Sequence, residues 1–394
     1  MKKTAKSEIG EDLFRNLPSE IVSDILSRLD VRTAMSGKCV CKSWLDLLTT
    51  PEFVKSHLSK SVPCLTITEL NLKLKSVTYK MVIELDFNCD WHRLNTVFHF
   101  DLPFRILSHC SINGLIFLKN NLDCILCNPI TREYIKLPCP RQPSTVTKWE
   151  IYGFGVSRMS GQYKLVRTSV LQRPPHLNFV ESECQVYTLG TGLWRRIGEC
   201  GQFEHLVENS VMALVCGNLH WWWKGTGALV PTQISHLDLE TESFGAISCP
   251  SSDDGYKERC LSSLRGCLCV CDNRNLVIDI WVMTEYGDEK SWTKQFRMLK
   301  DNVWGSLKQL DSIQVYRNGD MLMTRRTGKL LYHSSNTKTV KQVKFDSDYK
   351  LIYQIRLYTP SFLSLKTFAT ENVRAFTMEL GGGGAPGEAP LRLL

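Results

Sequence analysis

The feature that most constrains this fold is a strand–turn–strand unit that recurs along most of the chain. From Val62 onward, apolar and polar residues alternate, which is the period of a β-strand rather than of a helix. The polar turns between paired strand runs lie 61, 49, 50 and 46 residues apart, at Thr131, Gly192, Thr241, Ser291 and Thr337. Residues 62–370 number 309 and therefore hold about six units of roughly 51 residues each.

A repeat near 50 residues predicts a kelch-like β-propeller of about six blades. A propeller keeps its strand edges short and protected, so many short strands remain soluble without long helices to cover them. No long amphipathic helix interrupts the strand runs in this sequence. The alternative that the same pattern allows is a two-sheet β-sandwich-like domain.

The first part of the chain has a helical period instead. Behind Pro18, whose fixed φ suits a helix start, one apolar stripe is formed by Ile21, Val22, Ile25, Leu26 and Leu29. Asp30 is a candidate cap for a second helix, and Thr50 before Pro51 predicts a further helix start. Helices this short bury only part of their apolar surface against each other, so the stripe is expected to pack on the same chain or to bind a partner.

The change of period near Val62 predicts the domain organisation. Residues 1–10 are expected to form a flexible N-terminus, residues 11–60 a small all-α module and residues 62–370 a β-domain that folds independently of it. The last residues include four consecutive glycines from Gly381 and little that could form a core. Residues 371–394 are therefore predicted to be a disordered tail.

The spacing of the sixteen cysteines argues against a metal site and against any cofactor bound through them. Cys124 and Cys127 lie three apart on an expected strand and point to opposite faces, so they cannot share a metal ion. Cys267, Cys269 and Cys271 share one strand face, but neighbours about 6.6 Å apart are too distant to close on one zinc ion. We predict buried, reduced thiols, no metal, no cofactor, and a location in the cytoplasm and/or nucleus.

Charge and hydropathy bear on the possible partners. The formal net charge of +8 is spread over 394 residues, which favours solubility over nucleic-acid binding. The longest uncharged stretch, residues 209–223, has 15 residues and includes polar ones, so it does not predict a membrane span. We therefore expect neither a nucleic acid nor a membrane as partner.

No catalytic motif is present: the sequence lacks G-x-S-x-G, H-E-x-x-H and a phosphate-binding glycine loop. His220 lies in an alternating strand and is interpreted as a structural histidine. Beside it, Trp221 and Trp223 share one strand face and Trp222 takes the other. Packing between blades explains at least two of these tryptophans, whereas a position on a binding rim would make Trp222 a candidate contact. We predict that the chain is not an enzyme.

The helical segment resembles an F-box. The resemblance rests on Leu17-Pro18, on Ile25-Leu26-Ser27-Arg28-Leu29, on Val40-Cys41-Lys42-Ser43-Trp44 and on Pro51-Glu52-Phe53. One departure is Asp30, where the family commonly has proline. The F-box resemblance implies binding to a Skp-family adaptor, and through the adaptor to cullin and RING subunits. The residues that it implies as adaptor contacts are Leu17, Pro18, Ile21, Ile25, Leu26, Leu29, Val40, Cys41 and Trp44.

The β-region is similar to the F-box-associated domain of plant F-box proteins. The matching motifs run in order from Val62 to Leu365: Asn113-Gly114-Leu115, Asn128-Pro129-Ile130-Thr131, Leu137-Pro138, Tyr152-Gly153-Phe154-Gly155, Tyr163-Lys164-Leu165-Val166, Gly217-Asn218-Leu219-His220-Trp221 and Tyr358-Thr359-Pro360-Ser361-Phe362. This resemblance implies a substrate-recognition subunit of an SCF-type cullin–RING E3 ubiquitin ligase, in which the β-domain binds an unidentified target protein.

Blade loops are where target specificity is expected, because loops vary freely on a fixed scaffold. The candidate target-binding residues are Arg173, His176, Trp222, Asp253, Asp254 and Lys257. Two alternative functions are a helix-turn-helix DNA-binding protein and a carbohydrate-binding propeller. The first needs an exposed basic recognition helix, whereas residues 39–48 are mainly apolar; the second needs aromatic residues such as Trp222 at the rim.

Overall fold

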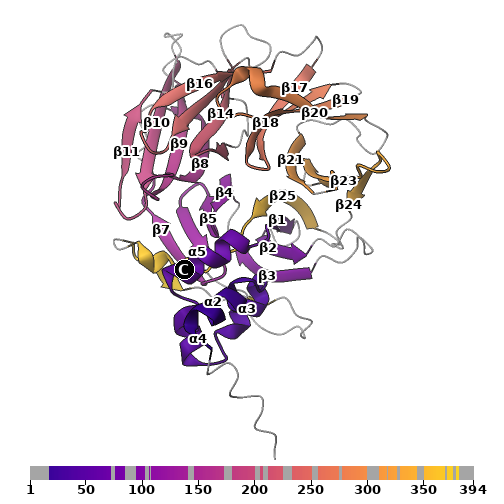
Figure 1. Cartoon of the computed structure of the whole chain (residues 1–394). Helices are drawn as coiled ribbons and strands as arrows, with labels where there is room; N and C mark the ends of the chain where they lie inside the picture. The colour runs from indigo at the N-terminus through magenta and orange to yellow at the C-terminus, as the bar shows by residue number, and fades with distance from the viewer. Residues whose placement is uncertain are drawn as a thin grey trace, which may run out of the picture.

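A computed structural model of the chain describes residues 17–71, 76–84, 95–102, 106, 108–140, 146–172, 180–199, 205–206, 212–224, 233–250, 256–274, 277–299, 310–316, 318–325, 329–343, 350–368, 371–375 and 379–380. A small helical module is followed by a ring of β-sheets (Figure 1). Among the described residues no helix is long and apolar enough to cross a membrane, since α5, the longest, has ten residues. The predicted flexible segment, residues 1–10, lies outside these ranges.

The helical module contains α2 (Ser19–Ser27), α3 (Val31–Gly37), α4 (Lys42–Leu47) and α5 (Pro51–Lys60). The Asp30 carboxylate accepts hydrogen bonds from the backbone N–H groups of Arg32 and Thr33, both at 3.0 Å, and so caps α3. The Thr50 hydroxyl accepts from the Phe53 N–H at 3.2 Å and caps α5 in the same way. Both predicted caps are confirmed, and the departure at Asp30 has a structural role.

In the part of the chain that the structure describes, the β-domain forms six antiparallel sheets, which we number as blades in chain order. Blade 1 contains β25 (Lys350–Tyr358), β1 (Cys64–Asn71), β2 (Ser76–Glu84), β3 (Asn95–Leu102) and β27 (Glu379–Leu380). Blade 2 contains β4 (Ser108–Ile112), β5 (Leu115–Lys119), β6 (Cys124–Asn128), β7 (Glu133–Leu137) and β26 (Arg374–Ala375). Blade 3 contains β8 (Val146–Val156), β9 (Tyr163–Gln172), β10 (Val180–Thr188) and β11 (Trp194–Gly198).

The second half of the ring repeats this arrangement. Blade 4 contains β13 (Ala213–Val215), β14 (Asn218–Lys224), β15 (Gln233–Asp238) and β16 (Phe244–Ser248), with β12 (His205–Leu206) paired to β14. Blade 5 contains β17 (Tyr256–Leu264), β18 (Cys267–Arg274), β19 (Val277–Met283), η1 (Glu289–Ser291) and β20 (Trp292–Leu299). Blade 6 contains β21 (Leu310–Val315), β22 (Met321–Arg325), β23 (Lys329–His333) and β24 (Val340–Val343). The predicted propeller class is confirmed, and the sandwich alternative is not what forms.

The ring is closed by strands from both ends of the chain. In blade 1 the late strand β25 pairs with β1, so a segment near the end of the chain completes the first sheet. Residues 371–394 were expected to be a disordered tail, but β26 pairs with β7 and β27 pairs with β3. The Glu371 carboxylate also accepts a hydrogen bond from the Tyr187 hydroxyl at 2.6 Å. The prediction is therefore wrong for residues 371–375 and 379–380, which extend two blades.

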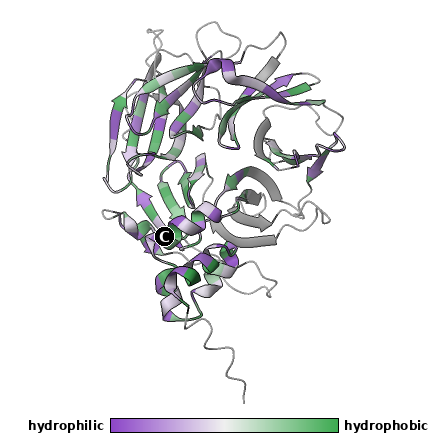
Figure 2. Ribbon diagram, viewed as in Figure 1, coloured by the Kyte–Doolittle hydropathy of each residue, from purple (hydrophilic) through white to green (hydrophobic). Residues whose placement is uncertain are grey.

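Apolar side chains are buried mainly between neighbouring blades. Figure 2 shows hydrophobic and hydrophilic residues interspersed along the coloured strands, and the buried clusters join residues of neighbouring blades. Trp221 packs with residues of blade 3, and Trp222 packs with residues of blade 5 such as Leu261 and Val270. Each tryptophan of this pair therefore joins blade 4 to a different neighbour.

The two rims of the ring differ in what they carry. Equivalent strands of successive propeller blades run in the same direction, so equivalent turns lie on the same rim. One rim, here called the helix rim, has the turns at residues 113–114 and 129–132, the start of β1 and the end of β25. At the opposite rim β9 ends at Gln172, β10 begins at Val180, and β18 ends at Arg274.

Candidate functional site

The exposed side of α2 is the first candidate surface. Ile21 and Ile25 lie one helical turn apart and have 49% and 40% of their surface exposed. The next residues along the chain, Val22 and Leu26, are buried, with 1% exposure for Leu26. The stripe that the sequence shows as one feature is therefore divided between solvent and the interior.

The segment that begins α4 provides further exposed apolar side chains. Val40 is 62% exposed, Leu45 is 41% exposed, and the Cys41 thiol is also at the surface. Cys41 is the N-cap residue of α4, and its carbonyl oxygen accepts a hydrogen bond from the Leu45 N–H at 3.1 Å, so the two residues lie one helical turn apart. Trp44 is half-buried instead and packs against the core cluster that contains Leu48 and Phe53.

The nine predicted adaptor-binding residues fall into three groups. The exposed residues are Pro18, Ile21, Ile25, Val40 and Cys41; the half-buried residues are Leu17, Leu29 and Trp44. Leu26 is the ninth, and its burial means that it supports the module from inside rather than being open to an adaptor. Sequence reasoning did not single out Leu45, although its spacing from Cys41 was an available signal.

A polar contact fixes α5 against α2. The Lys60 ammonium group donates to the Asp24 carboxylate at 2.7 Å and to the Ser27 hydroxyl at 2.6 Å. Hydrogen bonds from Lys60 and then from Arg28 lower the pKa of Asp24 from its ordinary value. The carboxylate stays charged at neutral pH, which maintains the contact beside the exposed face of α2.

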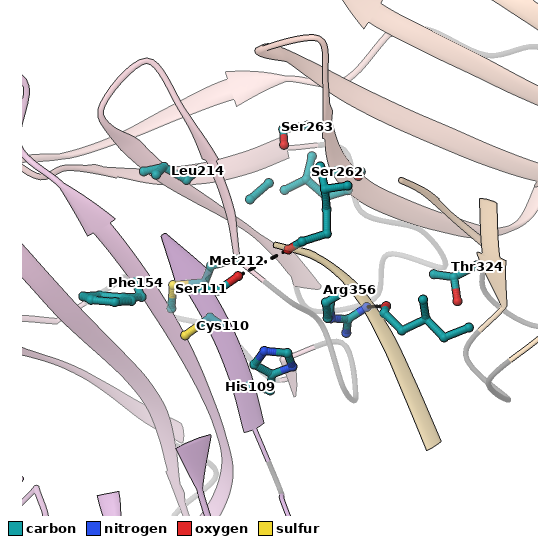
Figure 3. A pocket seen from close by; sticks show the side chains of 14 residues that line it. His109, Cys110, Ser111, Phe154, Met212, Leu214, Ser262, Ser263, Thr324 and Arg356 are labelled. Atoms are coloured by element: carbon teal, nitrogen blue, oxygen red, sulfur yellow. Dashed lines mark hydrogen bonds between the residues drawn. The ribbon is translucent and has the colours of Figure 1, made fainter. Parts of the chain in front are cut away.

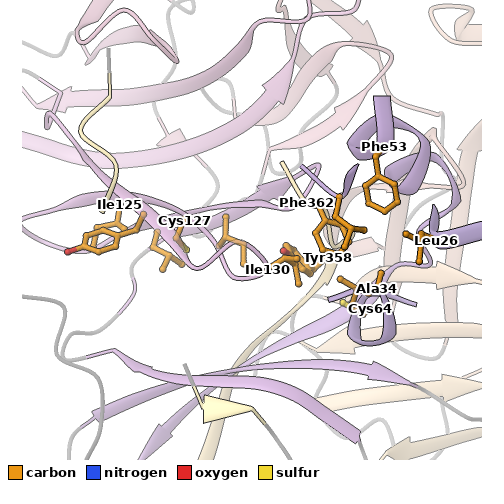
Figure 4. Packing of buried hydrophobic residues seen from close by; sticks show 14 of the residues in the cluster. Leu26, Ala34, Phe53, Cys64, Ile125, Cys127, Ile130, Tyr358 and Phe362 are labelled. Carbon is orange, nitrogen blue, oxygen red and sulfur yellow. The ribbon is translucent and has the colours of Figure 1, made fainter. Parts of the chain in front are cut away.

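The helical module shares one buried cluster with the propeller, which we call the junction (Figure 4). Phe362 lies 5.7 Å from the Phe53 ring and 4.9 Å from the His57 ring, in edge-on geometry. The Lys38 ammonium lies 5.0 Å from the centre of the Phe362 ring, which is a cation–π contact. Burial lowers the pKa of His57, so its ring is neutral at this contact.

The propeller holds Phe362 in place through motifs that are individually weak in the sequence. The Asn128 side-chain amide donates to the carbonyl oxygens of Ser361 and Leu363, at 3.0 and 2.7 Å. The Tyr358 hydroxyl donates to the Gly114 carbonyl at 2.9 Å. Gly114 has φ +84°, and a Cβ there would lie 2.5 Å from the Ser361 Cβ. These residues therefore form the base on which the helices pack.

The centre of the ring contains a cavity of about 220 Å³ (Figure 3). Its lining includes His109 and Ser111 from β4, Ser262 from β17 and Arg356 from β25. Burial, and to a smaller extent the charge of Arg356, lowers the pKa of His109 to about 3. Burial also raises the pKa of the Cys110 thiol in the same lining. At neutral pH these side chains are an uncharged imidazole and an uncharged thiol.

The predicted target-binding residues have different outcomes. Trp222 is 2% exposed and packs between blades 4 and 5, so the structure contradicts a position on the rim. Arg173, His176, Asp253 and Asp254 lie outside the described residues, and Lys257 lies in β17. The strand ends that flank residues 173–179 and 251–255 lie on the rim opposite the helices.

Two sequence families match this arrangement of helices and blades. The F-box associated beta propeller domain matches residues 83–358, which is more than half of the chain, and an F-box-like domain matches residues 14–59. The chain belongs to the F-box associated β-propeller family. Within this family it is a plant-type F-box protein, and both resemblances found in the sequence are confirmed.

The relatives of this F-box protein match it over most of their length. "F-box protein At3g07870" of Arabidopsis thaliana is 27% identical, with 84% of this chain and 88% of the relative covered. "F-box protein CPR1" of the same plant is 26% identical, with coverages of 86% and 84%. "F-box/kelch-repeat protein At3g23880" is 25% identical, with coverages of 84% and 91%.

Proposed function

We propose that this F-box protein is the substrate-recognition subunit of an SCF-type cullin–RING E3 ubiquitin ligase. An F-box in general implies a Skp-type adaptor as partner. In this chain the adaptor would cover Ile21 and Ile25 of α2 together with Val40 and Leu45 near α4. The adaptor in turn would connect the chain to the cullin and RING subunits.

One observation carries this proposal: the helical module is buried on one side and leaves apolar side chains exposed on another. Leu26 and Phe53 are covered by the chain itself, whereas Ile21, Ile25 and Val40 are at least 40% exposed. Fully burying an aliphatic side chain of this size stabilises a complex by about 1.5–3 kcal/mol. A groove that accepts an amphipathic helical face would use this surface.

The propeller would hold the target protein for ubiquitination and degradation, and its contribution to the rate would be proximity rather than chemistry. The opposite rim suits this role because the helices occupy the helix rim. The junction supports a fixed relation between the two partners, since Phe362 is buried among residues of both parts. Fourteen described cysteines are thiols outside disulfide bonds, and half of them are buried, which supports a reducing location in the cytoplasm and/or nucleus.

Co-purification with a Skp-family adaptor tests this proposal. The variant Ile21→Ala/Ile25→Ala removes exposed side chains and leaves the junction intact. The matched control Leu122→Ala/Leu193→Ala removes two side chains that are 81% and 60% exposed on the propeller. We expect the adaptor to be lost from the first variant and retained by the control. If both variants retained the adaptor at wild-type strength, the proposed docking surface would be wrong.

The same variant tests the separation of adaptor and target. Deleting residues 1–60 would uncover the buried residues Cys64, Tyr358 and Phe362, so a surface variant perturbs the propeller less than a truncation. In plant cells, the Ile21→Ala/Ile25→Ala chain should still bind its target but slow the target's degradation. Faster degradation than with the wild-type chain would contradict the receptor role.

A further inference from the structure

All six blades contribute to the lining of the central cavity. The lining includes Ser111 of β4, Phe154 of β8 and Thr324 of β22, together with residues of β13, β17 and β25. These six strands belong to six different blades. A molecule bound in the cavity would therefore contact the whole ring, and a single blade could not form the site by itself.

One part of the lining is apolar, and two glycines of β8 set its position. Met212 and Leu214, on the segment that forms β13, pack directly on the backbone of β8. A Cβ at Gly153 would lie 2.5 Å from the Met212 sulfur, and a Cβ at Gly155 would lie 2.8 Å from Cδ1 of the leucine. Larger residues at these positions would push both side chains out of place. The glycines of β8 therefore shape the apolar wall of the cavity.

Another part of the lining is polar and includes a cationic side chain. Figure 3 shows Arg356 between His109 and Thr324, which come from the neighbouring blades 1, 2 and 6. Phe154 and Leu214, from blades 3 and 4, lie at the other side of the same view. Burial is the main cause that lowers the pKa of His109, and the charge of Arg356 lowers it further. The cavity therefore has a cationic end and an apolar end.

The cationic end suits a carboxylate, although Arg356 also has partners within the protein. Its Nη1 donates to the Ile355 carbonyl at 3.5 Å, and it makes other contacts in the chain. A guanidinium presents five N–H donors in a planar fork, so it can bind a carboxylate in addition to protein groups. Among the lining residues that the structure describes, no side chain is acidic, and Ser262 and Thr324 add hydroxyl groups. A carboxylate at this end would therefore meet donors and no like charge from the described lining.

The volume of the cavity limits the size of a fitting molecule. An apolar cavity of about 150 Å³ holds one benzene molecule. The cavity here measures about 220 Å³, so it has room for one ring and a short side group, or about ten non-hydrogen atoms. A nucleotide or a folded peptide segment is too large to be enclosed as a whole. The expected occupant is therefore a small molecule.

We propose that the central cavity binds a small organic carboxylate whose other end is a single aromatic ring or an apolar group of similar size. The carboxylate contacts Arg356 and the Thr324 hydroxyl, and the ring lies against Met212 and Leu214. Small-molecule pockets are mostly apolar and contain a few polar groups that fix the orientation of the ligand, as this lining does. The adaptor surface lies on the helices, so this inference goes beyond the proposed function and does not depend on it.

Water alone and a phosphate ion are the rival occupants. A buried water molecule needs about two to four polar partners, and the wall formed by Phe154, Met212 and Leu214 offers no polar side chain. A phosphate group has several acceptor oxygens that point in different directions, so it is best bound by donors on more than one side. The lining therefore favours a molecule with one anionic end and one apolar end, and phosphate is included in the test as a competitor.

Fluorine NMR titration of the full-length chain tests the class of ligand. The probe is para-fluorophenylacetate, and the matched probes are the neutral para-fluorophenylacetamide and the cationic para-fluorophenethylamine. We expect the carboxylate to bind at least about tenfold tighter than the amide, and the amine to bind more weakly still. No binding of the carboxylate at about 1 mM, equal affinities for the carboxylate and the amide, or displacement of the carboxylate by equimolar inorganic phosphate would overturn the proposal.

Two variants locate the binding on the protein. Arg356→Gln removes the charge, so the carboxylate should bind about tenfold more weakly and lose its advantage over the amide. Ser263→Phe adds a ring at an exposed position of the lining and should abolish binding of both probes. The matched control is Arg265→Gln, which removes a guanidinium that donates to the Tyr316 carbonyl from outside the described lining. An unchanged preference for the carboxylate in Arg356→Gln, or an equal loss in the control, would contradict the assignment.

Thermal unfolding gives a second readout that does not use the fluorine signal. A ligand that binds only the closed ring raises the melting temperature of the chain as its concentration increases. We expect such a rise with para-fluorophenylacetate for the wild-type chain and for Arg265→Gln, and no rise for Ser263→Phe. The two cavity variants change different blades, so if one of them does not fold, the other still locates the site. An equal rise in the melting temperature of Ser263→Phe would place the binding elsewhere and overturn the proposal.

Discussion

Ile25 and Leu26 are neighbours in α2, yet they belong to two different surfaces of the helical module. The Leu26 side of the module is covered by the chain itself and shares a buried cluster with Cys64, Tyr358 and Phe362 of the propeller. On the Ile25 side, 40% of the side chain is exposed, and Ile21 one turn earlier is exposed as well. This difference in exposure indicates that folding stability and partner binding depend on separate residues of the same short helix.

The largest effect is expected on the covered side. Phe53 has no exposed surface and contacts both His57 and Phe362, so Phe53→Ala leaves a cavity in the junction. We expect a loss of about 3–5 kcal/mol in the free energy of unfolding, measured by urea denaturation. The control Leu45→Ala on the exposed side should cost less than about 0.5 kcal/mol. Equal losses would mean that the two sides do not differ as described.

Two glycine turns on the helix rim differ in whether they contact the segment that supports the junction. Gly114 and Gly266 occupy equivalent turns, with φ values of +84° and +78°. A Cβ at Gly114 would lie 2.5 Å from the Ser361 Cβ, whereas a Cβ at Gly266 meets nothing within 4 Å. Both alanine variants acquire backbone strain, but Gly114→Ala also displaces the segment that supports Phe362.

We therefore expect Gly114→Ala to destabilise the protein by about 1–3 kcal/mol more than Gly266→Ala does. Thermal unfolding followed by circular dichroism measures this difference. Indistinguishable melting temperatures for the two variants would contradict this expectation. They would show that the Gly114 turn contributes no more to stability than the Gly266 turn.

A smaller effect concerns pH and lies within the propeller, away from the junction. The His220 ring donates from Nδ1 to the Ala213 carbonyl at 3.1 Å and accepts at Nε2 from the Tyr286 hydroxyl at 2.9 Å. Burial lowers the pKa of His220 to about 4. In the unfolded chain a histidine titrates near 6.5, so between these values the unfolded state binds a proton that the folded state does not.

The stabilising contribution of neutral His220 is thus complete above about pH 6.5 and is lost as pH falls toward 4. We expect the free energy of unfolding to fall by about 1–2 kcal/mol between neutral pH and pH 5 because of this group. His220→Gln should remove this one contribution, so the free energy of unfolding should depend less steeply on pH. Urea denaturation at several pH values measures it. An unchanged pH slope in His220→Gln would contradict the buried, neutral imidazole.

Local signals in the sequence predicted much of this fold. Asp30 and Thr50 cap their helices as expected because a cap depends on a hydrogen bond to backbone only two or three residues away. The spacing of turns near 50 residues predicted the propeller because each blade repeats the same four-strand unit. Features that depend on nearby residues were therefore available from the sequence alone.

Features that depend on distant contacts were not. The apolar period of α2 gives Ile25 and Leu26 equal weight, and only Phe362, more than 300 residues later, shows which side is covered. Trp222 lies in an alternating strand where either face can be buried, and packing of blade 5 decided the outcome. The strand at Arg374–Ala375 has only two residues, too few for a period, and forms because β7 offers an open edge.

The central claim is that adaptor binding uses the exposed side of α2 while the covered side maintains the fold. Isothermal titration of a Skp-family adaptor into Ile25→Ala and Leu26→Ala, each confirmed to be folded at the assay temperature, tests it most directly. Ile25→Ala should lose about 1–3 kcal/mol of binding free energy with an unchanged unfolding curve. Leu26→Ala should keep near wild-type affinity and lose about 2–5 kcal/mol of unfolding free energy. Wild-type affinity for Ile25→Ala together with a large loss of affinity for a stable Leu26→Ala protein would contradict the account.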